Sequence, residues 1–134
     1  MKDQIYSQLK KELNNSYSPY SKFKTAALVV TDKGNYLGCN IENASYSLTN
    51  CAERSAIFNA ISNGAKQFKK LYLISSSNKL DVIPCGSCLQ VMAEFFKPIT
   101  PIVVYSNSGK VVSYQLKDLL PKTFTKKELN NAKK

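Results

Sequence analysis

The chain has 134 residues, of which 43% are hydrophobic and 21% are charged, a composition that excludes disordered and fibrous proteins. No apolar run approaches the roughly 20 residues that a membrane-spanning helix needs. The amphipathic first 15 residues also lack the continuous apolar stretch of a secretory signal. We therefore expect one cytoplasmic globular domain over residues 1–134, with no membrane partner.

The formal net charge is +10, nearly all of it from lysine, and it has two interpretations. One is a nucleic-acid partner, because basic surfaces attract phosphate backbones. The other is a solvated lysine-rich surface. The lysines are scattered in the sequence, and arginine, the residue preferred for bidentate phosphate contacts, occurs once. This distribution favours the solvated surface, so we expect no nucleic-acid partner.

Hydrophobic periodicity predicts helix and strand in the first half of the chain. A helix is expected over residues 2–15, which carry apolar side chains at helical spacing. Two strands over residues 25–31 and 36–42 follow, joined by a turn at Lys33-Gly34. A second helix is expected over residues 51–63, because small apolar side chains recur on one side and Gly64 follows.

The second half of the chain predicts a strand over 70–76, a helix over 86–97 and strands over 101–106 and 111–115. The tail from residue 116 is leucine-bearing and helix-prone. A helix between successive strands favours crossover connections and a mixed sheet covered by helices. Two cysteine-containing motifs fall at strand-to-helix junctions, the edge of an α/β sheet where ligands bind.

The four cysteines suggest metal or redox chemistry, because a cytosolic C-x-x-C seldom forms a structural disulfide. Cys85 and Cys88 are spaced to place both sulfurs on one side of a helix's first turn, where the helix dipole favours thiolate. Taken alone, this pair has three interpretations: half of a zinc site, a redox-active pair, or a chance spacing with no function. With Cys51 it gives three thiolates and an open fourth position, typical of catalytic zinc. Cys39, mid-strand, is interpreted as a buried filler; a structural zinc would need it as fourth ligand.

The motif CAER, residues 51–54, places a carboxylate and the single arginine beside the first of these cysteines. Glu53 is positioned to handle the proton of a metal-bound water, but Asn50 and Glu53 also have the spacing of a helix capping box. Arg54 has two interpretations as well. It is a surface arginine, or it donates to the thiolates and offsets the net charge of −1 that three of them give with Zn²⁺.

Together these residues resemble the zinc nucleoside deaminase signature, C-A-E followed by P-C-x-x-C, in the form that replaces histidine with cysteine. The chain, which contains no histidine, is similar to the small homotetrameric cytidine deaminases over essentially its whole length. Further matches to that family's pattern are SPYSKF (18–23), GCNIEN (38–43), Tyr46, PCGSC (84–88), Gln90 and LLPKTF (119–124).

The resemblance implies a three-layer α-β-α sandwich around a mixed five-stranded sheet. It also implies one Zn²⁺ per chain, bound by Cys51, Cys85 and Cys88. Glu53 would take a proton from water, pass it to ring nitrogen 3 of cytosine and help protonate the departing ammonia. The implied activity is hydrolytic deamination of cytidine and deoxycytidine in pyrimidine salvage.

The same resemblance implies the substrate contacts. Asn40 and Glu42 would hold the ribose hydroxyls, Phe23 would pack on the base, and the Ala52 backbone N–H would meet the 2-keto oxygen. The last two contacts, Tyr46 and Phe124, would reach the site of a neighbouring subunit, so that a homotetramer shares its active sites. The residue pattern also supports a binding site for a sugar diol, because Asn40 and Glu42 are expected on the same face of one strand. The simpler interpretation is that they are two ordinary polar residues on an exposed face.

The chain departs from the family pattern in three segments: Lys24-Thr25-Ala26 replaces the usual Pro-Val-Gly, Leu89 replaces an arginine, and Lys122-Thr123 replaces Gly-Ala. Two other functions stay open. The first is deamination of a different cytosine-bearing molecule, such as an aminoglycosyl-nucleoside antibiotic or a nucleic acid. The second is a zinc-stapled basic binding module without catalysis, which leaves Glu53 unexplained.

Overall fold

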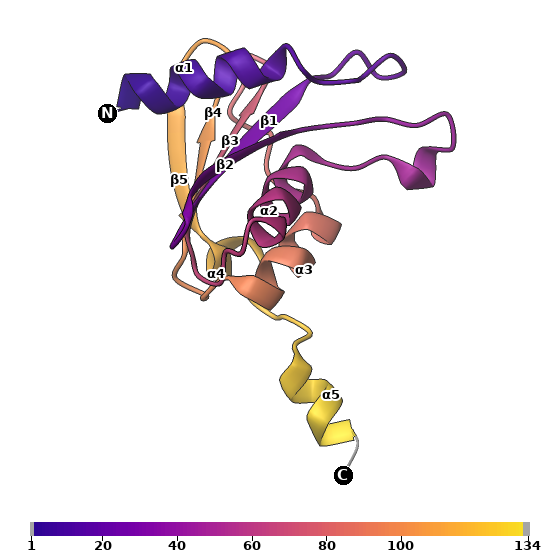
Figure 1. Cartoon of the computed structure of the whole chain (residues 1–134), viewed down its shortest axis with the longest axis vertical. Helices are drawn as coiled ribbons and strands as arrows, with labels where there is room; N and C mark the ends of the chain where they lie inside the picture. The colour runs from indigo at the N-terminus through magenta and orange to yellow at the C-terminus, as the bar shows by residue number, and fades with distance from the viewer. Residues whose placement is uncertain (1, 133–134) are drawn as a thin grey trace.

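The computed structural model describes residues 2–132, which form one five-stranded sheet with helices on both faces (Figure 1). The strands are β1 Thr25–Thr31, β2 Gly34–Cys39, β3 Phe68–Ser75, β4 Pro101–Tyr105 and β5 Val111–Gln115. Their order is β2-β1-β3-β4-β5, with β3 and β4 parallel and the other neighbours antiparallel. The expected mixed sheet is confirmed.

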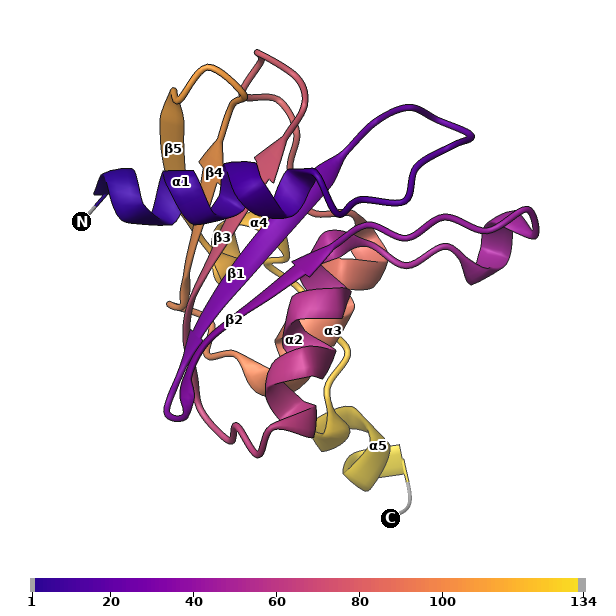
Figure 2. The ribbon, with the colours of Figure 1, turned by 45° about the horizontal axis from the view of Figure 1, so that its top comes forward.

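The helices are α1 Lys2–Leu13, α2 Ala52–Ser62, α3 Gly86–Phe95, α4 Leu116–Leu119 and α5 Lys126–Ala132, with a short 3-10 turn η1 at Tyr46–Leu48. Helix α1 covers one face of the sheet, while α2 and α3 lie side by side on the other, which confirms the three layers (Figures 1 and 2). The helix-prone tail is two short helices, because Pro121 cannot continue a helix. No helix within residues 2–132 is both long and apolar enough to cross a bilayer.

The core has two parts because alternate residues of each strand point to opposite faces of the sheet. On β1, Ala27 and Val29 pack beneath α2 and α3, whereas Ala26 and Leu28 pack beneath α1. The strands β3 and β4 follow the same alternation. Both faces of the central strands are therefore buried.

Helix α2 approaches β2 very closely at Gly38. A Cβ atom added there would lie 2.3 Å from the backbone nitrogen of Ala56 and 2.7 Å from the carbonyl carbon of Ser55. Both neighbours are backbone atoms and cannot move aside by changing rotamer. Only glycine at this position permits the helix to lie where it does.

Strand β2 ends three residues earlier than the sequence predicts. Asn40 N–H still donates to the Thr25 carbonyl, but beyond it the chain leaves β1, and Ile41 pairs with Tyr17 on one side and with Asn50 on the other. The expectation that a regular strand extends to residue 42 is wrong. The alternation of polar and apolar residues is real, but their partners are loop segments.

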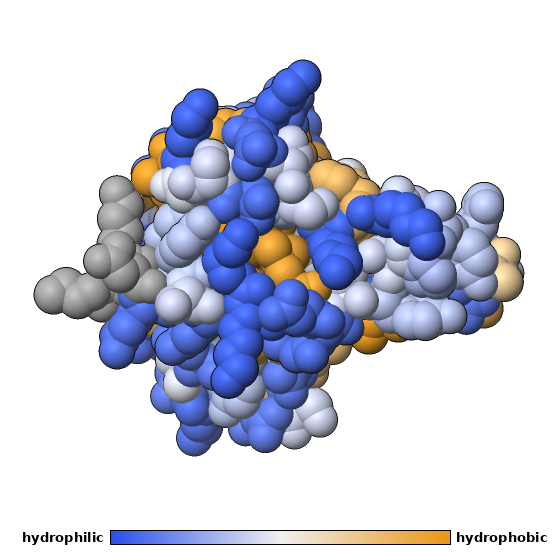
Figure 3. All heavy atoms as spheres, turned by 90° about the horizontal axis from the view of Figure 1, so that it is seen from above, coloured by the Kyte–Doolittle hydropathy of each residue, from blue (hydrophilic) through white to orange (hydrophobic). Residues whose placement is uncertain are grey.

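These pairings create a projection that we call the arm, formed by residues 16–24 and 40–50 (Figure 2). Its exposed large apolar side chains are Tyr17, Tyr20, Phe23, Ile41, Tyr46 and Leu48. Viewed from above, the arm extends to the right mostly in pale colours with small orange areas at its edges, while strongly blue hydrophilic side chains cover much of the body (Figure 3).

Candidate metal centre

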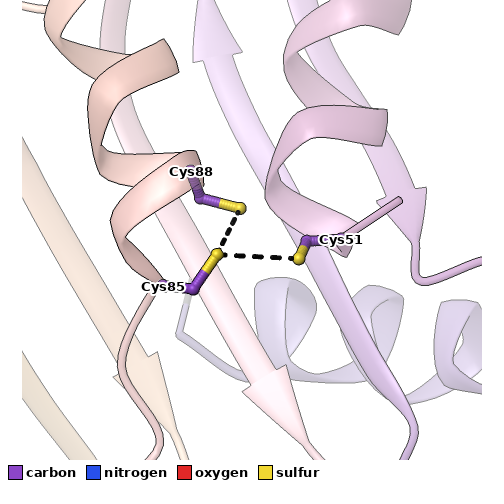
Figure 4. A group of neighbouring side chains, drawn as sticks. All are labelled: Cys51, Cys85 and Cys88. Carbon is purple, nitrogen blue, oxygen red and sulfur yellow. Dashed lines mark hydrogen bonds between the residues drawn. The ribbon is translucent and has the colours of Figure 1, made fainter. Parts of the chain in front are cut away.

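Three cysteine sulfurs converge where α2 and α3 begin (Figure 4). Cys51 and Cys85 are the residues immediately before these two helices, and Cys88 lies one turn into α3. The Cys51 and Cys85 sulfurs are 3.8 Å apart, those of Cys85 and Cys88 are 3.6 Å apart, and all three lie within 4.8 Å of one another. Sequence motifs 34 positions apart thus form one group.

The spacing and chemistry of these sulfurs fit a zinc ion. Sulfurs about 2.3 Å from a tetrahedral zinc lie about 3.8 Å from one another. The two measured separations, 3.8 and 3.6 Å, match that edge length. Soft thiolates select zinc over magnesium or calcium. Cys39 is a free thiol outside this group, buried in the interior, where burial raises its pKa.

Arg54 lies on the first turn of α2 and donates from Nη2 to the sulfur of Cys51, at 3.3 Å. Its Nε is buried and has no hydrogen-bond partner among the described residues. Contact with the Cys51 sulfur is the main cause that raises the pKa of Arg54 above its usual value. The surface interpretation of this arginine is wrong, because the guanidinium faces the sulfur group.

Contacts among the thiols of this group strongly shift the pKa values of Cys51 and Cys88. The hydrogen bond from the Cys88 thiol is the main cause that lowers the pKa of Cys51 to about 5, and Arg54 and Cys85 lower it further. The same contact with Cys51, together with burial, raises the pKa of Cys88. One sulfur therefore carries negative charge readily, a property that metal ligation requires.

Glu53 is buried at the start of α2, with 5% of its surface exposed. Burial raises the pKa of its carboxyl to about 7; its own backbone N–H and Arg54 oppose the rise, and the charge of Cys51 adds to it. A carboxyl group with a pKa near 7 can both accept and release protons under neutral conditions. Such a perturbed group beside a ligand cluster is typical of a catalytic acid–base residue.

The capping-box interpretation of Asn50 and Glu53 is wrong. The residue that caps α2 is Cys51, which makes no side-chain capping hydrogen bond, and the Asn50 amide instead donates to the Ser55 hydroxyl at 3.2 Å. Asn50 does not occupy the N-cap position of α2, because its backbone N–H and C=O both form hydrogen bonds with Ile41, at 2.9 Å each. Glu53 is therefore not committed to helix capping.

Asn40 and Glu42 both direct their side chains at residues 16–25, although neither lies in a regular strand as the sequence predicts. The Asn40 side chain is buried; it donates to the Phe23 carbonyl at 2.8 Å and accepts from Thr25 N–H at 3.0 Å. Glu42 accepts from the backbone N–H groups of Tyr20 and Ser21, at 3.0 and 3.1 Å. These bonds to the loop have no signal in the sequence.

The remaining candidates lie in two settings. Ala52 is fully buried at the start of α2, whereas Tyr46 and Phe124 expose 75% and 56% of their surfaces. The Gln90 side chain, to which the sequence assigned no role, donates to the Phe124 carbonyl at 2.7 Å and ties the C-terminal segment to α3. Leu89, where the family pattern has arginine, is buried in the core beneath α2 and α3.

Comparison with known proteins gives one consistent family. Residues 1–106 match the model of the cytidine and deoxycytidylate deaminase zinc-binding region. The cytidine deaminase of Sporosarcina psychrophila is 40% identical over 131 residues, which cover 97% of this chain and 96% of that protein. The cytidine deaminase of Halalkalibacterium halodurans is 41% identical over 117 residues, covering 87% and 88%.

The fold comparison agrees. The crystal structure of cytidine deaminase from Burkholderia pseudomallei superposes with a TM-score of 0.84 and 38% sequence identity. The aligned region covers 91% of this chain and 98% of that one. The family match over residues 1–106 includes the segments that carry the sulfur group and the arm.

Proposed function

This chain belongs to the cytidine and deoxycytidylate deaminase family, and we propose that it hydrolyses cytidine and deoxycytidine to uridine and deoxyuridine with release of ammonia. The observation that carries the proposal is the placement of the buried Glu53 carboxyl two residues after one member of a three-sulfur group. A redox pair would need only two of these sulfurs. A purely structural zinc would need a fourth ligand, which the group of three does not provide.

In this proposal Cys51, Cys85 and Cys88 hold one Zn²⁺ per chain. Zinc bound there supplies a Lewis acid that lowers the pKa of a water molecule toward neutrality. Glu53 accepts a proton from the attacking water and delivers it to ring nitrogen 3 of cytosine. It then moves the proton of the hydroxyl added at carbon 4 to the departing amino group, so that ammonia leaves and the 4-keto group forms; its pKa of about 7 favours this second transfer.

The substrate contacts follow from the arm and the start of α2. Asn40 and Glu42 hold the sugar hydroxyls, Phe23 packs on the base, and the Ala52 backbone N–H meets the 2-keto oxygen. A hollow of about 370 Å³ beside Glu42, lined by Tyr20, Ser21, Tyr46 and Thr49, supports a sugar site on this side of the arm.

Replacing Arg54 with alanine is expected to lower kcat about 10- to 100-fold or weaken zinc binding by a similar factor, as loss of a group that orients metal ligands usually does. The guanidinium at 3.3 Å from the Cys51 sulfur offsets thiolate charge that otherwise weakens zinc as a Lewis acid. The measurement is kcat together with zinc content. Arg54→Lys keeps the charge without the planar fork and is expected to recover part of the loss; unchanged kinetics and zinc content in Arg54→Ala would contradict this role.

We also propose that the protein is a homotetramer with shared active sites. Tyr46 on the arm and Phe124 before α5 expose most of their apolar surfaces. Large exposed apolar side chains on a projection support a protein partner. A second copy that covers these residues places them beside the substrate of its neighbour.

Shared sites predict complementation between two damaged chains. In a mixed assembly of Glu53→Gln and Phe124→Ala chains, some sites combine an intact Glu53 with an intact Phe124 from the neighbour. The cytidine deaminase activity of the mixture is therefore expected to exceed the sum of the two separate activities after subunits are exchanged. An activity equal to that sum would show that Phe124 acts in its own chain or not at all.

We place the reaction in pyrimidine salvage, in the cytoplasm, within a single domain over residues 1–134. The experiment that tests the activity follows ultraviolet absorbance and ammonia release on mixing the purified protein with cytidine or deoxycytidine. Turnover of both is expected. No turnover of either nucleoside, together with salt-dependent retention on DNA, would favour the zinc-stapled basic binding module instead. Turnover only of a different cytosine-bearing molecule would favour deamination of an antibiotic or a nucleic acid.

A further inference from the structure

The residues proposed to bind the sugar and the base are linked to each other through the loop between α1 and β1. Asn40 and Glu42, on the arm's second segment, both bond to the loop that carries Phe23. The backbone continues this pairing, because Tyr17 N–H donates to the Asn40 carbonyl and Glu42 N–H donates to the Tyr17 carbonyl. The sugar side and the base side of the site are therefore one hydrogen-bonded unit.

The peptide groups of Phe23 are held on both sides. Its N–H donates to the Ser21 hydroxyl oxygen at 3.0 Å, and its C=O accepts from the Asn40 amide at 2.8 Å. The preceding residue, Lys22, has a φ of 61°, a left-handed conformation that non-glycine residues seldom adopt. This turn is closed by a bond from Lys22 N–H to the Ser18 carbonyl at 3.0 Å. The loop around Phe23 thus has a specified conformation.

The Ser21 hydroxyl connects Glu42, on the sugar side of the site, with Phe23, on the base side. Its hydroxyl donates to Glu42 Oε2 while the hydroxyl oxygen accepts from Phe23 N–H. The Ser21 hydroxyl is also the main cause that lowers the pKa of Glu42, a carboxylate that is ionised at neutral pH. Bonds of a hydroxyl to an ionised carboxylate are stronger than those between neutral groups.

We propose that Ser21 is a positioning residue whose hydroxyl orients the Glu42 carboxylate toward the sugar and fixes the Phe23 backbone beneath the base, so that recognition of the two halves of the nucleoside is coupled. The inference rests on the proposed function and adds a residue to it. Ser21 lines the hollow beside Glu42, but in this account it touches neither reacting atoms nor metal ligands and acts through Glu42 and Phe23.

The test compares cytidine with 2′,3′-dideoxycytidine, two substrates that differ only in the ring hydroxyls proposed to bind Glu42 and Asn40. In Ser21→Ala, kcat/KM for cytidine is expected to fall about tenfold, mainly through KM, as for loss of one hydrogen bond to a charged group. The fall for the dideoxy substrate is expected to be threefold or less, as it has no ring hydroxyl for Glu42. Ser21→Thr keeps the hydroxyl and is expected to restore the cytidine value to within about twofold.

Ser77→Ala is the matched control. The Ser77 hydroxyl also accepts a backbone N–H two residues on, from Lys79 at 3.0 Å, but it has no bond to Glu42 or Phe23. This variant is expected to leave kcat/KM for both substrates unchanged. Equal losses for the two substrates in Ser21→Ala would reduce Ser21 to a loop-stabilising residue and overturn the proposal, as would no loss with cytidine.

A second readout does not depend on activity. Amide hydrogen exchange at Phe23 is expected to become about tenfold faster in Ser21→Ala, because the acceptor for its N–H is gone, and to stay unchanged in Ser77→Ala. Unchanged exchange at Phe23 in Ser21→Ala would contradict the link to the base. A wild-type protein that deaminates neither nucleoside would contradict the proposed function, while the exchange measurement would still decide the role of Ser21.

Discussion

Replacing Glu53 with glutamine is expected to lower kcat for cytidine deamination by roughly 10²–10⁴-fold, the contribution typical of a positioned acid–base group. Glutamine has nearly the same shape and fits the same buried place, but its amide can neither accept the proton of an attacking water nor return it to the leaving group. Zinc content is expected to stay at the wild-type level, because the sulfur ligands are untouched. The measurement is steady-state turnover of cytidine alongside zinc analysis.

Glu94→Gln makes the same chemical change on an exposed position of α3, and it is expected to leave kcat and zinc content unchanged. Full turnover by Glu53→Gln would show that some other group moves the protons. Loss of zinc from Glu53→Gln would show that the carboxyl has a structural role at the metal.

The second large effect is expected at Gly38, where alanine should lower the free energy of unfolding by about 3 kcal/mol, the upper end for overpacking a tightly packed site. A methyl group at 2.3 Å from the Ala56 backbone nitrogen forces α2 away from β2. Because α2 begins at the sulfur group, zinc affinity and turnover are expected to fall as well. Thermal unfolding should show a midpoint about 10 °C lower.

Gly86→Ala is the control for this change, because a Cβ at Gly86 meets nothing within 4 Å and the position needs no positive φ. Its melting temperature is expected to stay within about 2 °C of the wild type. A Gly38→Ala protein as stable as the wild type would show that α2 and β2 separate at little cost, contrary to the packing described here.

The sulfur group could be anticipated from sequence because each of its parts depends on local rules. The spacing of Cys85 and Cys88 places both at the first turn of one helix, and Cys51 opens the preceding helix. That the two helix beginnings meet follows from the order of strands and helices, since the carboxyl ends of parallel strands lie at one edge of a sheet.

The arm could not be anticipated because its structure depends on pairs far apart in the chain. Polar and apolar residues alternate from Cys39 to Glu42 as in a strand, yet Ile41 pairs with Tyr17 and Asn50 rather than with β1. The same pairing displaces Asn50 from the helix cap that its side chain favours. The alternation of polar and apolar residues correctly indicated an extended backbone, but it did not indicate which segments pair with it.

The close helix contact at Gly38 also could not be predicted from sequence, because it depends on packing between separate segments. The sequence motif GCNIEN includes this glycine, but no property of the segment alone indicates that a helix backbone will lie against it. The contact becomes visible only when β2 and α2 are placed together. Likewise, the bond from Gln90 to the Phe124 carbonyl joins residues 34 positions apart, with nothing local to predict it.

The most direct measurement is zinc per chain in purified, active protein, followed through removal of the metal with a chelator and its return. We expect one zinc per chain, loss of cytidine turnover as the zinc is removed, and recovery when zinc is restored. Folded protein that deaminates cytidine at full rate with no bound metal would contradict the account, as would a zinc whose four ligands are all side chains.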